Sequence, residues 1–181
     1  MDEAREFLRA YYQAFVEEKI QHSERVLRVC DEIADLLRQL ADVDLNLELL
    51  RKAAILHDIA KFDNKGLHHK LAADVICEHQ LSSIPENEGE RIGKIIRAHK
   101  GDTFKPGGWE NALLAAILRM ADKIDKAVQK GDQETVDENL DIIHQYFKEK
   151  EKERRPLPVT FKVFQRACKA AEGLERNRKG A

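Results

Sequence analysis

The stretch AAILHDIAKF, from Ala53 to Phe62, begins as an apolar helix and ends in polar residues. His57 and Asp58 stand side by side at the end of the apolar run, and Lys61 follows one turn after His57. A buried imidazole or carboxylate is unfavourable unless another group compensates it. We therefore expect a helix whose end faces the interior, where both side chains can turn toward partners on other helices.

Apolar residues at helical spacing extend along most of the chain and predict an all-α fold. Asn46 is a candidate N-cap for the helix that leads to His57, and the loop Asp102–Trp109, with its Pro-Gly-Gly, interrupts the pattern. No segment has the alternating pattern of a strand. We expect helices at about 3–15, 20–40, 46–56, 67–79, 87–98 and 110–129, another after Lys130, and a last one from Thr160.

The composition is typical of a soluble helical protein with charged outer faces. Of 181 residues, 43% are apolar and 35% are charged, and the formal net charge is −2. This balance provides no basic field for nucleic acid or an anionic membrane, and no apolar run is long enough to span a bilayer. Cys30, Cys77 and Cys168 are far apart, so we expect core thiols in a reducing, cytoplasmic setting.

Residue types that ligate metals interrupt several apolar helical segments. Asp122 lies inside the strongly apolar segment ILRMADKID, where an unpaired carboxylate is unfavourable. Imidazole nitrogens and carboxylate oxygens are ligands of Zn, Mn and Fe and, where oxygens predominate, of Mg. A metal shared between helices would compensate such residues together. The candidates are His22, His57, Asp58, His68, His69, His99 and Asp122.

Single candidates also have explanations without a metal. A histidine at a helix C-terminus, such as His57, can cap the helix and interact with its dipole. Asp122 could pair with an Arg or Lys, and His22 could cap its helix or lie at the surface. His79 and His144 lie in charged helical contexts without a partner motif, and we expect surface or packing roles for them.

The order and context of these residues resemble the HD superfamily of metal-dependent phosphohydrolases. HSERVLRV, which starts at His22, resembles the family's first-ligand helix, and ILHDIAK, with His57 and Asp58, resembles its central motif. LRMADKID resembles the helix that carries the family's last aspartate, here Asp122. The resemblance covers residues 20–127 and implies a single helical HD domain over 1–181, with C-terminal helices at 131–181 packed on that core.

Some members of the superfamily hold one divalent metal, and others add two histidines and hold two. HHKLAADVI resembles the segment with the first extra histidine, and IIRAHKG the segment with the second. The first is ambiguous between His68 and His69, and we slightly prefer His68. The resemblance allows Fe, Mn, Co, Zn or Mg. The ligands that it implies are His22, His57 and Asp122 for one ion, His68 or His69 with His99 for the other, and Asp58 between them.

This six-ligand layout is similar to that of bacterial hydrolases that split dinucleoside tetraphosphates symmetrically. The sequence differs from theirs in the short loop between Asp58 and His68 and in the glycine at the second position after His99. The resemblance implies hydrolysis of a small-molecule phosphomonoester or phosphoanhydride, with a nucleotide as the expected substrate. Asp58 would orient a metal-activated hydroxide, and Lys61 would meet a substrate phosphate.

Further residues near these motifs are candidates for contact with the substrate. Arg25 and Lys100 could reach a phosphate, although an exposed ion pair explains Arg25 equally well, and Lys61 could be a solvated surface lysine. Trp109 could stack on a base or pack at a helix start.

Two other functions fit the same residues. One is di-iron oxygenation on the same fold, which also uses six ligands. The other is a non-catalytic domain that senses a nucleotide, against which the complete ligand set argues. The sequence leaves the oligomeric state open, with a homodimer among the alternatives.

Overall fold

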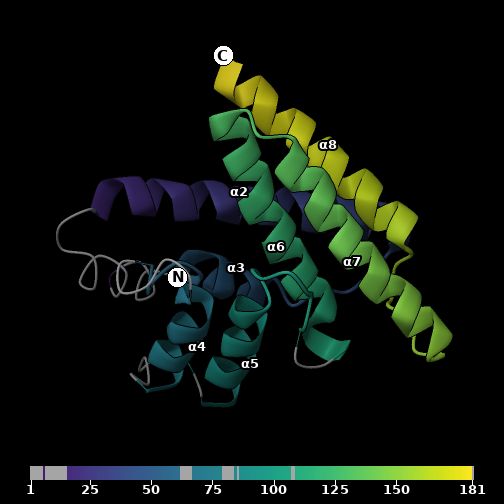
Figure 1. Ribbon diagram of the computed structural model, residues 1–181, viewed down its shortest axis with the longest axis horizontal. Helices are drawn as coiled ribbons and strands as arrows, with labels where there is room; N and C mark the ends of the chain where they lie inside the picture. The colour runs from purple at the N-terminus through teal and green to yellow at the C-terminus, as the bar shows by residue number, and fades with distance from the viewer. Residues whose placement is uncertain are drawn as a thin grey trace.

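The computed structural model describes residues 6, 16–61, 67–78, 84, 86–106 and 109–180 (Figure 1). These residues form helices and contain no strand, which confirms the predicted all-α fold. Apart from residue 6, the helix expected at about 3–15 lies outside the described residues, as do His79 and the side chains of Cys77 and Trp109. The helices are α2 (Val16–Ala41), α3 (Leu47–Leu56), α4 (His68–Glu78), α5 (Glu86–Arg97), α6 (Trp109–Lys130), α7 (Glu134–Lys152) and α8 (Phe161–Gly180).

The ends of the helices follow capping rules that are visible in the sequence. The side chain of Asn46 accepts a hydrogen bond from the backbone N–H of Leu49 at 3.0 Å, so it caps α3 as predicted. Replacing such a cap by Ala costs about 1 kcal/mol of stability. Helix α2 begins at Val16, earlier than expected, and Glu17 and Glu18 occupy its first turn, where the helix dipole favours negative charge.

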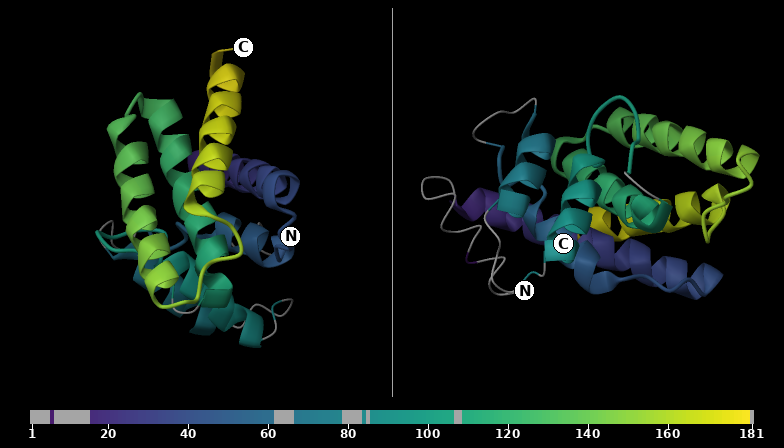
Figure 2. Two further views of the ribbon diagram at one scale, coloured as in Figure 1. Left: turned by 90° about the vertical axis from the view of Figure 1, so that its right-hand side faces the viewer. Right: turned by 90° about the horizontal axis from the view of Figure 1, so that it is seen from below.

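Helix α6 is the central element of the fold. Every residue from Asn111 to Asp125 is buried, as expected for a helix that other helices enclose on all sides. It packs against α2, α3, α5, α7 and α8, and Figure 2 shows it between α7 and α8. A polar side chain on this part of α6, such as that of Asp122, therefore lies inside the protein.

The remaining helices pack around α6 in two groups. Helices α4 and α5 pack against each other, and α5 also contacts α3 and α6 (Figure 1). Helix α7 packs on α6, and α8 packs on α2 and α6. An ion pair joins α2 to α8, with Arg28 Nη2 2.7 Å from Glu175 Oε1.

Cys30 and Cys168 are buried free thiols, as predicted.

None of the described helices is both long enough and apolar enough to cross a bilayer.

Candidate metal centre

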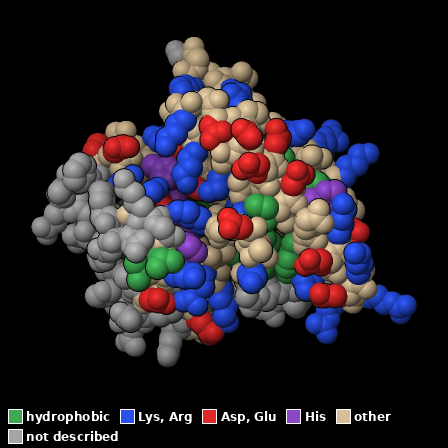
Figure 3. Space-filling model, viewed as in Figure 1, with side chains coloured by type: hydrophobic (Ala, Val, Ile, Leu, Met, Phe, Trp, Pro, Cys, Tyr) green, Lys and Arg blue, Asp and Glu red, His purple; other side chains and the backbone are tan. Residues whose placement is uncertain are grey.

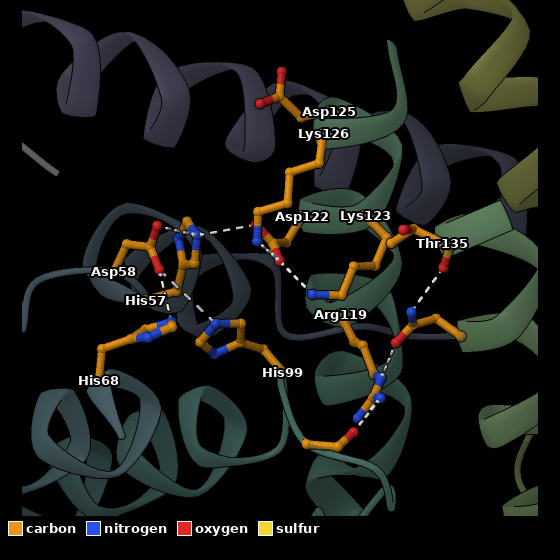
Figure 4. A network of polar contacts seen from close by, with 12 residues as sticks. His57, Asp58, His68, His99, Arg119, Asp122, Lys123, Asp125, Lys126 and Thr135 are labelled. Carbon is orange, nitrogen blue, oxygen red and sulfur yellow. Dashed lines mark hydrogen bonds and ion pairs between the residues drawn. The ribbon is translucent and has the colours of Figure 1, made fainter. Parts of the chain in front are cut away.

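Side chains from five segments of the chain converge at one place between α2, α3, α4, α5 and α6. Figure 4 shows several of them facing one another. All of them are buried. The converging residues are His22 of α2, His57 and Asp58 of the turn after α3, His68 at the start of α4, His99 of the turn after α5, and Asp122 of α6.

Two of the histidines are held by the end of the helix that precedes them. His57 Nδ1 lies 2.8 Å from the carbonyl oxygen of Ala54, and His99 Nδ1 lies 2.6 Å from that of Ile96. A carbonyl can only accept, so Nδ1 carries the proton in both rings and Nε2 is the nitrogen that faces the centre. Each residue therefore acts as a helix cap and as a potential ligand at once.

The first part of the centre, which we call position 1, lies beside His22, His57 and Asp122. His22 Nε2 lies 3.4 Å from Asp58 Oδ2 and 3.4 Å from Asp122 Oδ1. His57 Nε2 lies 3.7 Å from each of the same two oxygens. Ligand atoms of His22, His57 and Asp58 all lie within 4.8 Å of one another, a spacing that a metal ion can bridge.

The second part, which we call position 2, lies beside His68 and His99. His68 Nε2 lies 3.0 Å from Asp58 Oδ1, and His99 Nε2 lies 4.0 Å from the same oxygen. Ligand atoms of Asp58, His68 and His99 also lie within 4.8 Å of one another. Asp58 thus directs one oxygen to each position, as a bridging carboxylate would.

Between the two adjacent histidines, the geometry favours His68. His69 is buried and its ring lies 6.2 Å from that of His99, but only His68 shares a ligand group with Asp58 and His99. Burial, His68 and the nearby Lys100 lower the pKa of His69 to about 4. His69 therefore lies beside position 2 as a neutral imidazole.

Several of the atoms that face the centre lack hydrogen-bond partners among the described residues. Leaving a buried donor or acceptor unpaired costs about 1–3 kcal/mol. Several such atoms at one place are therefore unfavourable unless an additional group satisfies them, and a divalent cation fits both the nitrogen lone pairs and the carboxylate oxygens. The atoms are Nε2 of His22, His57 and His99, and Oδ1 of Asp58 and Asp122.

The charges around the carboxylates keep both of them ionised. Burial alone would raise the pKa of Asp58, but His57, His22 and His68 outweigh it and hold that pKa well below its usual range. Burial also opposes ionisation of Asp122, but Lys126 and Lys123 outweigh it and lower its pKa strongly. Both residues are therefore negatively charged ligand candidates at neutral pH.

Asp122 forms ion pairs with two lysines in addition to facing the centre. Its Oδ2 lies 2.9 Å from Lys123 Nζ and 2.6 Å from Lys126 Nζ, while Oδ1 faces His22 and His57. The ion pair that could by itself explain a buried aspartate is therefore present, but it occupies only one of the two oxygens.

Sequence reasoning missed Asp125, which supports His22. Asp125 Oδ2 lies 2.7 Å from His22 Nδ1, so this ring also directs Nε2 toward the centre. Hydrogen bonds of this kind from a carboxylate fix the tautomer and orientation of metal-ligating histidines. The available signal was the position of Asp125 three residues after Asp122, on the same side of α6.

Arg25, a candidate for substrate contact, pairs with the same carboxylate. Its Nε lies 2.6 Å from Asp125 Oδ1. Burial alone lowers the pKa of His22, but the neighbouring carboxylates of Asp122, Asp125 and Asp58 outweigh it and raise that pKa to about 10. His22 is consequently protonated when no metal competes for its nitrogen.

A small cleft leads from the surface to His22 and is lined by cations. Its volume is about 140 Å³. Figure 3 shows one face of the molecule, on which some histidine atoms are surrounded by Lys and Arg side chains. Lys61, the lysine of the opening sequence stretch, lines this cleft and pairs with Asp58 Oδ2. The cationic residues that line the cleft are Lys19, Arg25, Lys61, Lys126 and Lys130.

Comparison with known proteins agrees with this geometry at the level of the family. The family model for the HD domain matches residues 20–127, which confirms the family resemblance but not the likeness to dinucleoside-tetraphosphate hydrolases. No curated protein matches the chain significantly.

Proposed function

Because this chain belongs to the HD-domain family, we propose that it is a metal-dependent phosphohydrolase whose substrate is a phosphomonoester or phosphoanhydride, with a nucleotide as the expected substrate. The observation that carries the proposal is the convergence of buried imidazole nitrogens and carboxylate oxygens on one space, at spacings that a metal ion can bridge. This donor set suits Fe, Mn, Co, Zn and, less well, Mg, because most of its atoms are imidazole nitrogens.

In this proposal, the residues divide between two divalent ions. His22, His57 and Asp122 would hold the ion at position 1, and His68 and His99 the ion at position 2. Asp58 would contact both, since its two oxygens face different histidines. Ions held in this way lower the pKa of water and offset charge on phosphoryl oxygens.

The chain's own residues would orient the reactants. Asp58 is the carboxylate nearest to both groups of histidines, so it is the residue that can hold a nucleophilic water between them. Asp125 keeps the His22 ring turned so that Nε2 faces position 1. The carbonyl oxygens of Ala54 and Ile96 do the same for His57 and His99.

The cationic cleft supports a phosphate-containing substrate. Lys61 and Lys126 form ion pairs that compensate the negative charges of Asp58 and Asp122, the same carboxylates that would ligate metal. Burial and the neighbouring Lys61 lower the pKa of Lys19, which reflects the crowding of positive charge at the mouth of the cleft. Divalent ions on the carboxylates would compete with these lysines, and the oxygens of a phosphate would then be favourable partners for them.

The experiment has two stages. The protein is purified without chelators and its metal content is measured, and then phosphate release is followed with a panel of nucleotides and simple phosphate esters in Mn²⁺, Co²⁺, Fe²⁺ and Mg²⁺. We expect bound metal and phosphate release that EDTA abolishes. Turnover that requires oxygen would instead favour a di-iron oxygenase, and nucleotide binding without turnover would favour a sensor; either result would reject the proposal.

A further inference from the structure

A buried arginine connects the loop that carries His99 to helix α7. Arg119 of α6 has only 2% of its surface exposed. Its Nη2 donates to the carbonyl oxygen of Gly101 at 2.6 Å, and its Nη1 makes a longer contact of 3.5 Å with that of Ala98. Its Nε donates to Asn139 Oδ1 at 2.7 Å (Figure 4). One side chain thus contacts Ala98, immediately before His99, and Gly101, two residues after it.

Arg119 is unusual among the buried cations because its partners are neutral. Within the described residues, no carboxylate forms an ion pair with it, whereas Lys123 is paired with Asp122. Burial lowers the pKa of the Arg119 guanidinium to about 10, so it stays charged at neutral pH. Asp122 and Asp102 favour the charged form from a distance, but a buried charge whose direct partners are all neutral oxygens is unfavourable for stability alone. The contacts of Arg119 with the carbonyl oxygens around His99 therefore indicate that Arg119 positions this loop.

Asn139 is oriented for this contact by α7 itself. Its Nδ2 donates to the backbone carbonyl of Thr135 at 2.7 Å, so its Oδ1 is the atom turned toward Arg119. Asn139 is buried, with 6% of its surface exposed. Helix α7 lies outside residues 20–127, the segment that matches the HD domain. The link therefore joins a helix outside that segment to the metal centre.

The loop that follows His99 includes a glycine with a positive φ angle, and Arg119 binds its carbonyl. Gly101 has φ of 105°, in the region that favours glycine, and this turn presents its carbonyl to Arg119. His99 itself is fixed on the other side by Nδ1 and by its backbone N–H, which both donate to Ile96. Releasing Gly101 would leave the His99 ring with support from only one direction.

We propose that Arg119 and Asn139 are positioning residues for His99, so that α7 sets the affinity of position 2 for its ion. This inference rests on the proposed metal binding at position 2. Helix α7 would then be part of the functional unit, because Asn139 aligns the guanidinium that holds both ends of the His99 turn.

The test uses Asn139→Leu in the full chain, with Asn111→Leu as the matched control. Asn111 is also buried, at 5% exposure, and its Oδ1 also accepts from an arginine, Arg91 Nε at 3.3 Å. Among the described residues, its side chain forms no hydrogen bond with the His99 loop. Metal-free protein is titrated with Co²⁺ and followed by its absorption bands. We expect two phases in the wild type, and an about tenfold weaker second phase in Asn139→Leu alone, with the first unchanged.

Two further measurements separate positioning from general damage. Asn139→Asp loses the donor to Thr135 but keeps an oxygen acceptor, which its charge makes a stronger partner for Arg119, and it should restore the second phase to within about threefold of wild type. In metal-free protein, hydrogen exchange of the amides at 98–101 should be about tenfold faster in Asn139→Leu than in Asn111→Leu.

An unchanged second phase in Asn139→Leu, an equal loss in Asn111→Leu, or no rescue by Asn139→Asp would overturn the inference. If wild-type protein binds no cobalt, the proposed metal function fails. In that case unchanged hydrogen exchange would reject the positioning role as well, whereas faster exchange would support the link from α7 to His99.

Discussion

Positions 1 and 2 are built on different kinds of structure. At position 1, His57 follows the end of α3, but His22 and Asp122 come from the interiors of α2 and α6, which have 26 and 22 residues. At position 2, His68 is the first residue of α4 and His99 follows the end of α5. Helix ends depend on caps and neighbouring loops, whereas helix interiors are held by the whole ladder of backbone hydrogen bonds.

The supporting groups differ in the same way. His22 at position 1 is held by the charged carboxylate of Asp125, and Asp122 by two lysines. His99 at position 2 is held by a neutral backbone carbonyl, with Arg119 bound to the loop beyond it. Hydrogen bonds to charged groups are the stronger kind. Because charged partners hold His22 and Asp122 in place, position 1 is the more preorganised of the two. We expect it to bind its ion more tightly than position 2.

The largest effect should come from the residue that both positions share. Asp58→Ala removes both oxygens that face the histidines, so we expect turnover to fall by about a thousandfold or more. Metal analysis should show loss of both ions, while circular dichroism keeps its helical signal. Asp31→Ala is the control, because Asp31 pairs with Arg51 and lies outside the centre. Wild-type rates in Asp58→Ala would reject the centre.

The next test separates the positions. His99→Ala should lower the metal content from two ions per chain toward one, and His22→Ala should weaken the tighter site. Turnover should fall by about a hundredfold in each case, since either change removes a direct ligand. Mass spectrometry of metals after gel filtration gives the ratio. If wild-type protein and His99→Ala both hold one ion per chain, only position 1 binds metal, and the proposed difference between the positions is rejected.

A smaller effect should follow from the support of His22. Asp125→Asn keeps the size of the side chain but removes its charge, and loss of such a partner weakens metal binding by about 10–100-fold. We expect this loss at position 1 only, measured by competition with a coloured chelator. Equal weakening at both positions would indicate a general disturbance of α6, not a loss of orientation at His22.

The smallest effect should be at the mouth of the cleft. Lys61→Ala should raise KM for a phosphate substrate by about tenfold, because one charged hydrogen bond to phosphate is lost. Metal content should stay at its wild-type value. Lys94→Ala is the control, since Lys94 pairs with Glu90 on α5 away from the cleft. Loss of metal in Lys61→Ala would show that the lysine supports Asp58 and has no separate role in substrate binding.

Most of the fold was predictable because its signals are local. The apolar spacing of α6 and the Asn46 cap of α3 are each contained in a few consecutive residues. The candidates in the centre could be named for a similar reason, since they lie within or at the ends of apolar helical segments and follow the order of the HD motifs. Arg119 could not be distinguished from other charged residues, because its role depends on contacts with distant segments. The spacing of Asp125 from Asp122 was a local signal, but its contact with His22 joins residues far apart in the sequence.

The sequence by itself determined which residue types occur at the helix ends and interiors, and that an imidazole and a carboxylate follow α3. Only the tertiary structure decided which ring nitrogen faces the centre, that His68 and not His69 groups with Asp58, and that α7 reaches the His99 loop through Arg119. The physical reason is the distance along the chain between the residues that interact. Helix formation is fixed by neighbours within about four residues, whereas the direction of each side chain is set by helices that pack from distant parts of the chain.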